Sequence, residues 1–155
     1  MTSVEGSLPH IDEHSVEIDA TPATTWEALG RVVEGSFASG ATPRLSRALG
    51  CADTDAAGPR PLAEGSTLPG FHVAAATAPQ ELALAGSHRF SNYELIFRLE
   101  DLGEERTRLR AETRAEFPGL KGSVYRGLVI GTRGHVLVTR RLLGATKRRA
   151  ERTAA

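Results

Sequence analysis

Three consecutive runs of alternating apolar and polar residues constrain the fold of this chain more than any other feature. The apolar positions are Leu82, Leu84, Gly86, His88 and Phe90 in the first run, Tyr93, Leu95, Phe97 and Leu99 in the second, and Leu109, Ala111, Thr113, Ala115 and Phe117 in the third. Because successive side chains of a strand point to opposite faces, each run predicts a strand with one apolar and one polar face. An antiparallel sheet of this kind needs a cover for its apolar face.

A long helix-compatible segment from Leu120 to Arg149 follows the three runs and is the natural cover. Residues on one face of this predicted helix are Leu120, Val124, Leu128, Gly131, His135, Val138 and Leu142. Its interior glycines each cost about 1 kcal/mol relative to alanine. They leave two explanations open: close approach to the sheet or to a bound molecule, or a bend near Gly131 to Gly134.

The first half of the chain predicts four further elements. They are a strand from His14 to Asp19, a helix from Pro22 to Phe37 capped by Thr21, a short element from Arg44 to Leu49, and a strand from Phe71 to Thr77. We expect turns at Ser91-Asn92 and at Leu102-Gly103-Glu104. The expected architecture is an α+β fold in which a curved antiparallel sheet wraps around a long C-terminal helix. One or two short helices follow the first strand, residues 1–12 form a flexible N-terminus, and residues 13–152 form a single domain.

Composition narrows the range of partners. The chain has 19 basic and 19 acidic side chains, so its overall charge does not favour nucleic acid. The lone Cys51 cannot form an internal disulfide, and its neighbours do not activate it as a reactive thiol. There is no signal-like start and no apolar run long enough for a membrane span. We therefore expect a soluble cytoplasmic protein without a membrane span and without a nucleic-acid partner.

The segment His10-Ile11-Asp12-Glu13-His14 matches the H-x-x-E-H zinc pattern of one metalloprotease class. That pattern works only on a helix, where residues four apart share a face. In an extended segment the two histidines would lie roughly 13 Å apart. We expect an extended segment here, because a strand follows it, so we predict no metal site. No other motif indicates a cofactor, and we expect none.

The order of predicted elements resembles the START-like helix-grip superfamily, also known as SRPBCC or birch-pollen-allergen-like, which includes polyketide cyclases and dehydratases. The segments that carry the resemblance are Val16 to Pro22, Trp26 to Leu29, Leu68 to Phe71, Glu81 to Leu84, Tyr93 to Leu99, and Thr107 to Leu109. The resemblance implies a hydrophobic or amphipathic ligand held between the sheet and the last helix. It brings no catalytic residue, because the superfamily has no shared catalytic motif.

Polar groups on the predicted apolar faces are the candidates for chemistry. The catalytic candidates are His88, His135 and Tyr93. In a polyketide cyclase, one of the histidines would remove or return a proton at an enolisable carbon, and Tyr93 would stabilise the carbonyl oxygen. Each also has an ordinary structural explanation as a satisfied core or rim residue. The predicted ligand cavity consists of Trp26, His88, Phe90, Tyr93, Leu95, Phe97, Thr113, Leu128, Gly131 and His135.

Three functions follow as hypotheses. The first is binding of a lipid or polyketide-like small molecule without transforming it, and the second is a polyketide cyclase or dehydratase that uses the cavity histidines. The third is a protein-interaction domain whose cavity is collapsed. The alternating charges from Arg108 to Glu116 predict cross-strand pairing on a solvated face. Ile96 on that face leaves a homodimer possible.

Overall fold

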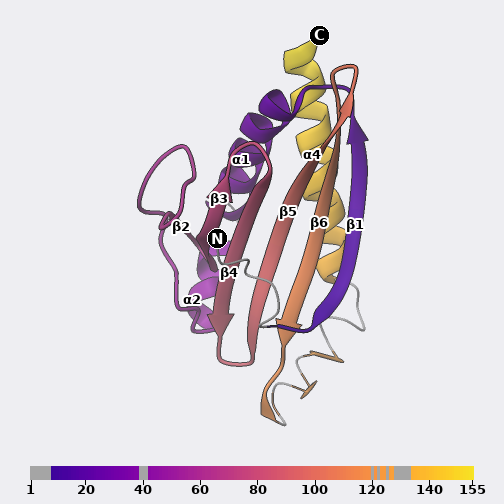
Figure 1. Cartoon of the computed structure of the whole chain (residues 1–155). Coiled ribbons are helices and arrows are strands. Elements are labelled where there is room, and N and C mark those ends of the chain that lie inside the picture. The colour runs from indigo at the N-terminus through magenta and orange to yellow at the C-terminus, as the bar shows by residue number, and fades with distance from the viewer. Residues whose placement is uncertain (1–7, 39–41, 120, 122, 125, 128–133) are drawn as a thin grey trace.

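Six strands form one antiparallel sheet, and helices cover one of its faces (Figure 1). The structure is a computed structural model, which describes residues 8–38, 42–119, 121, 123–124, 126–127 and 134–155. The elements are β1 (His10–Ile18), α1 (Pro22–Ala38), α2 (Thr42–Ala48), β2 (Thr67–Leu68), β3 (Phe71–Thr77), β4 (Glu81–His88), β5 (Ser91–Gly103), β6 (Arg106–Glu116) and α4 (Gly134–Ala154). Their order across the sheet is β1-β6-β5-β4-β3-β2. The first strand therefore closes the meander by pairing with the last.

The pairing register places the predicted apolar positions of neighbouring strands side by side. Leu84 in β4 pairs with Leu95 in β5, and Phe97 in β5 pairs with Ala111 in β6. Phe97 and Leu84 are fully buried, and so are Leu29 and Val33 on α1. The alternation of side chains along the strands thus builds one shared core, as the sequence pattern predicts.

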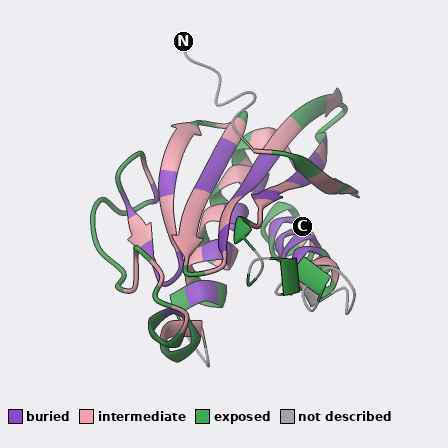
Figure 2. Cartoon of the chain, turned by 90° about the horizontal axis from the view of Figure 1, so that it is seen from below, coloured by how far each residue is buried: buried purple, intermediate pink, exposed green. Residues whose placement is uncertain are grey.

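The sheet curves around α1 and α4, which pack on its apolar face and against each other (Figure 2). The N-terminus of α1 is capped by Thr21, whose Oγ1 accepts a hydrogen bond from the Thr24 amide at 3.2 Å. One side of α4 is buried in the core, at Leu142, Leu143 and Ala150. These features confirm the α+β helix-grip architecture.

The outer face of the sheet is a network of cross-strand ion pairs. Across strands, Glu100 contacts Arg108 and Arg110, and Glu112 contacts Arg98; within β6, Glu112 also contacts Arg114. Burial opposes ionisation of Glu112, but hydrogen bonds from Arg114, His10 and Arg98 outweigh it and lower the pKa of Glu112 to about 2. The predicted pairing of charges on this face is confirmed.

Ile96 also lies on the outer face, but it is 3% exposed. Its neighbour in β4, Ala83, is also 3% exposed. An apolar residue that its own chain covers offers little contact area to a second copy. Ile96 therefore does not support a homodimer contact on this face. The homodimer stays a prediction.

Several boundaries differ from the sequence-based predictions. The first strand starts at His10 rather than His14 and so includes residues that were assigned to the flexible N-terminus. The β4–β5 turn consists of Arg89 and Phe90, not Ser91-Asn92. The β5–β6 turn is Glu104-Glu105, with φ of 53° and 57°. Positive φ at both central residues is typical of the tight type I′ hairpin, which fits the right-handed twist of the strands.

The segment before α4 agrees only in part with the predicted long helix. The described residues between Gly119 and Gly127 are helical. However, Val124 is 62% exposed, although the pattern put it on the buried face. The predicted bend near Gly131 to Gly134 falls mostly outside the described residues. Within the part of the chain that the structure describes, none of the helices has the length and apolar character needed to cross a bilayer.

Candidate functional site

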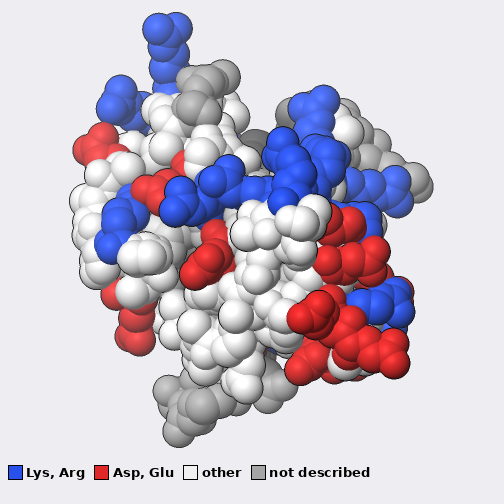
Figure 3. Space-filling model, turned by 90° about the horizontal axis from the view of Figure 1, so that it is seen from above, with Lys and Arg blue, Asp and Glu red and all other residues white. Residues whose placement is uncertain are grey.

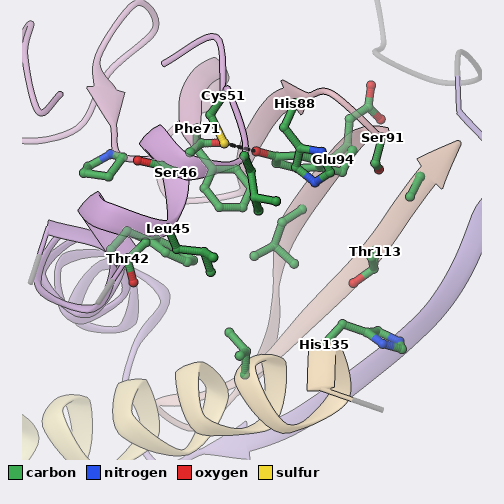
Figure 4. Close-up of a pocket in the computed structure, with 18 of the residues that line it drawn as sticks. Thr42, Leu45, Ser46, Cys51, Phe71, His88, Ser91, Glu94, Thr113 and His135 are labelled. Carbon is green, nitrogen blue, oxygen red and sulfur yellow. Dashed lines mark hydrogen bonds between the residues drawn. The ribbon is translucent and has the colours of Figure 1, made fainter. Parts of the chain in front are cut away.

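A cavity of about 330 Å³ lies between the sheet, α2 and the first turns of α4 (Figure 4). Its wall is mostly apolar, with a few polar side chains. The lining residues are Ile11, Phe37, Thr42, Leu45, Ser46, Leu49, Cys51, Pro69, Gly70, Phe71, His88, Ser91, Tyr93, Glu94, Leu95, Thr113, Ala115, Phe117, His135, Val138 and Thr139. Leu45 on α2 is 57% exposed and Val138 on α4 is 47% exposed, so the cavity opens to solvent between these two helices.

The structure brings five of the predicted cavity residues together. These are His88, Tyr93, Leu95, Thr113 and His135, which come from β4, β5, β6 and α4. They meet because the alternation of each strand puts them on the same face as the core. Leu128 and Gly131, also predicted to line the cavity, lie outside the described residues.

Three predicted residues do not line this cavity. Phe97 is fully buried in the core beneath it. Trp26 lines a separate hollow between α1 and the loop around Pro61. Phe90 sits in the β4–β5 turn, where its ring stands 6.0 Å from that of His88. Periodicity identified the inward face for Phe97, but it does not tell how far along an element the core gives way to a cavity, and it did not identify Phe90 as a turn residue.

The sequence reasoning missed the wall formed by α2 and the loop after it. Leu45, Leu49 and Cys51 line the cavity there, together with Phe71 at the start of β3. The spacing of Leu45 and Leu49 by four residues is a helical signal. This signal agrees with the short element predicted from Arg44 to Leu49, but a local pattern does not show that the element lines a cavity.

His88 is held in one protonation state by its surroundings. Its Nδ1 accepts a hydrogen bond from the backbone amide of Phe90 at 3.1 Å. An accepting Nδ1 carries no proton, so the neutral ring has its proton on Nε2. Burial lowers the pKa of His88 below its ordinary value of 6.5. His88 is therefore a neutral hydrogen-bond donor, which does not fit the predicted role of a general base.

This arrangement predicts the pH dependence of His88. Because its pKa is lower in the folded protein than in the unfolded chain, the unfolded chain takes up a proton first as the pH falls below 6.5. The contribution of His88 to the free energy of unfolding is therefore complete above pH 6.5 and decreases as the pH falls toward the folded pKa. We expect an NMR titration to place the His88 midpoint below 6.5. A midpoint above 6.5 would contradict the assigned hydrogen bond.

The Tyr93 hydroxyl is also hydrogen-bonded within the protein. Its hydroxyl donates a hydrogen bond to the Gly70 carbonyl at 2.5 Å and lies 3.7 Å from the Cys51 sulfur (Figure 4). Its ring packs edge-on against Phe71, with the ring centroids 5.2 Å apart. A hydroxyl whose proton is already donated to a backbone carbonyl is poorly placed to steady a ligand carbonyl. Tyr93 mainly shapes the cavity wall and ties β5 to the loop before β3.

His135 pairs with Asp12 of β1. Its Nε2 lies 2.7 Å from Asp12 Oδ2, and the same oxygen lies 3.3 Å from His14 Nε2. The side chains of His135 and Asp12 are 15% and 23% exposed, so this pair is partly shielded from water. Figure 4 shows His88 and His135 at opposite sides of the cavity. The two histidines therefore do not act on each other directly.

The H-x-x-E-H pattern lies in β1, as expected, and not on a helix. His10 Nδ1 lies 2.7 Å from Glu112 Oε2, and His14 Nε2 lies 3.3 Å from Asp12 Oδ2. The two histidines thus have separate partners. The described residues hold no cluster of three or more side chains suited to a metal ion.

Comparisons with known proteins agree on the fold. No protein-family model matches the chain, and the curated proteins include no match to it. Among solved structures, the Zhui aromatase/cyclase from Streptomyces sp. R1128 is similar over 96% of each chain, with 16% identity and a TM-score of 0.57. CalU16 from Micromonospora echinospora is similar over 96% of this chain and 94% of its own, with 15% identity and a TM-score of 0.51.

Identities this low establish a common architecture and leave activity open. The likeness extends over almost the whole of both chains, and the sheet, the helix order and the terminal helix agree with the sequence-based expectation. The chain therefore has the helix-grip fold of the START-like proteins.

Proposed function

We propose that this protein binds a hydrophobic or amphipathic small molecule, such as a lipid or a polyketide-like aromatic, in the cavity between the sheet, α2 and α4. The observation that carries the proposal is the cavity itself, whose volume of about 330 Å³ lies within the range of small-molecule sites. Its wall is dominated by apolar residues such as Leu45, Leu95 and Phe117. A cavity of this size favours ligand binding over the alternative of a collapsed cavity.

The hydrogen bonds of the cavity favour binding over proton transfer. His88 Nδ1 accepts a hydrogen bond from the Phe90 amide, and the Tyr93 hydroxyl donates one to the Gly70 carbonyl. Both groups that the cyclase hypothesis needs are therefore already hydrogen-bonded within the protein. We therefore propose binding without conversion as the main function.

A cyclase or dehydratase remains the second candidate because of one observation. His135 lines the cavity and is paired with a carboxylate, Asp12, which is a common arrangement for a histidine that moves protons. The likeness to the Zhui aromatase/cyclase is consistent with this alternative. Replacing His88 and His135 by glutamine separates the two functions. Turnover of a poly-β-keto substrate by the wild type that the double variant loses would contradict binding without conversion.

Filling the cavity tests the proposal directly. Ala115 lines the cavity from β6 and is 6% exposed. Ala115→Phe should reduce the affinity for a hydrophobic fluorescent probe such as anilinonaphthalene sulfonate by at least about tenfold, because the larger ring occupies the ligand volume. Fluorescence titration measures the effect. Native mass spectrometry of protein from its own host would identify a copurifying ligand.

Ala85→Phe is the matched control, because Ala85 is in β4 on the opposite face of the sheet. It adds the same side chain outside the cavity and should leave probe affinity within about twofold of wild type. Equal probe binding by the wild type and Ala115→Phe would mean that the probe sits elsewhere. That result would overturn the proposed site.

A further inference from the structure

The mouth of the cavity combines exposed apolar side chains with two exposed arginines, Arg44 and Arg141. Leu45 and Val138 line the cavity while being 57% and 47% exposed, and Leu137 beside Val138 is 54% exposed. Globular proteins usually cover large apolar side chains at such positions unless another surface meets them. The mouth residues thus mark a surface that contacts something besides water.

The two chain segments beside the mouth carry basic side chains and no acidic ones, although Arg47 pairs with Asp55 at 3.3 Å and Lys147, Arg148 and Arg149 lie in the second half of α4, away from the mouth. The sequence has no acidic residue from Gly35 to Ala52, which includes α2, and none from Phe117 to Ala150, which includes most of α4. These two segments carry ten lysines and arginines, two in the first and eight in the second. The end of the molecule seen in Figure 3 has both basic and acidic side chains by contrast.

Two arginines stand next to the exposed apolar side chains. Arg44 is the neighbour of Leu45 on α2, and Arg141 follows Val138 by three residues, which places both on the same side of α4. Both arginines are exposed. The nearby acidic groups are Asp12, which contacts His135, Glu116, which accepts from Asn92 at 2.6 Å, and Glu94, which lines the cavity and is 7% exposed. At the rim of the mouth the exposed cations are therefore Arg44 and Arg141.

We propose that the cavity mouth docks on an anionic lipid membrane, with Arg44 and Arg141 at the headgroups and Leu45, Leu137 and Val138 at the boundary of the acyl chains. Basic residues interleaved with exposed apolar ones are the usual composition of an interfacial membrane contact. The loading of ligand through this contact rests on the proposed function, since an apolar ligand partitions into bilayers.

A membrane fits these observations better than an acidic protein partner. The apolar side chains project outward from two separate helices, and a protein partner would need hollows that match each of them over an interface of about 800 Å² per side. A fluid bilayer accepts such projections without matching hollows. It also supplies the negative charge that complements the rim.

Vesicle flotation with the full chain tests the proposal. Wild-type protein should bind vesicles of phosphatidylcholine with 30% phosphatidylglycerol at least about fivefold more than pure phosphatidylcholine vesicles, and high salt should remove the difference. The double variant R44E/R141E should lose at least about tenfold in vesicle binding. Leu45→Ser with Val138→Ser should also bind less, because the apolar contact is lost.

The control is R148E/R149E, which makes the same change in charge about two turns further along α4. It should bind vesicles within about twofold of wild type. Equal losses in both charge variants would mean general attraction and overturn the proposal. Absence of wild-type binding to vesicles, or capture of an acidic protein at this surface instead, would also overturn it.

A vesicle-free titration with Nile red, an uncharged apolar dye, separates the two proposals. R44E/R141E should bind this probe as wild type does, because the cavity wall is unchanged. Loss of vesicle binding with retained probe binding supports the docking surface. Wild-type vesicle binding without any probe binding would contradict the proposed function and leave the docking surface standing.

Discussion

Replacing Gly86 by alanine is expected to destabilise the protein by about 3 kcal/mol and to disturb the cavity wall. A Cβ atom at Gly86 would overlap the Gly70 carbonyl oxygen and would stand 2.5 Å from Cε2 of Tyr93. Tyr93 lies directly opposite Gly86 in the β4–β5 pair, so its ring has no room to move away while it donates to Gly70. Urea unfolding of Gly86→Ala measures the loss, and probe titration measures the damage to the cavity.

Gly30→Ala is the matched control for this substitution. Gly30 lies within α1, and a Cβ there meets no heavy atom within 4 Å. Alanine should stabilise the helix by about 0.5 to 1 kcal/mol, because glycine loses more backbone entropy on folding. A Gly86→Ala protein as stable as wild type would show that the contact between Gly86, Gly70 and Tyr93 is not as close as the structure has it.

Phe97→Ala is expected to cost about 3 to 5 kcal/mol of unfolding free energy. Phe97 is fully buried at the centre of the sheet, where it pairs with Leu82 on one side and Ala111 on the other. Removing its ring leaves a void that the surrounding strands cannot close. Chemical denaturation measures the cost, and probe affinity should change less than stability does, because Phe97 does not line the cavity.

Phe117→Ala provides the comparison, because Phe117 lines the cavity near the end of β6 and is only partly buried. Its loss should cost less stability than that of Phe97 and should alter probe binding more. The reverse order of effects would place Phe97 at the ligand and return it to the set of cavity residues that its alternation predicted.

Local patterns in the chain were enough to predict most of the strands and the faces of their side chains. The alternation from Leu82 to Phe117 predicted which residues point inward, and the observed pairs such as Leu84 with Leu95 follow that pattern. Thr21-Pro22 predicted the start of α1 correctly. These features are local, since the period of side-chain directions and the capping of a helix depend on residues near one another in the chain.

Only the tertiary structure decided where the core ends and the cavity begins. Phe97 and Tyr93 share one face of β5, yet the first fills the core and the second lines the cavity. The contacts of His88, Tyr93 and His135 with Phe90, Gly70 and Asp12 decide their chemistry. Two of these contacts join residues 23 and 123 positions apart. Periodicity carries no information about such distances, because they are set by how the sheet curves and by where α2 and α4 pack against it.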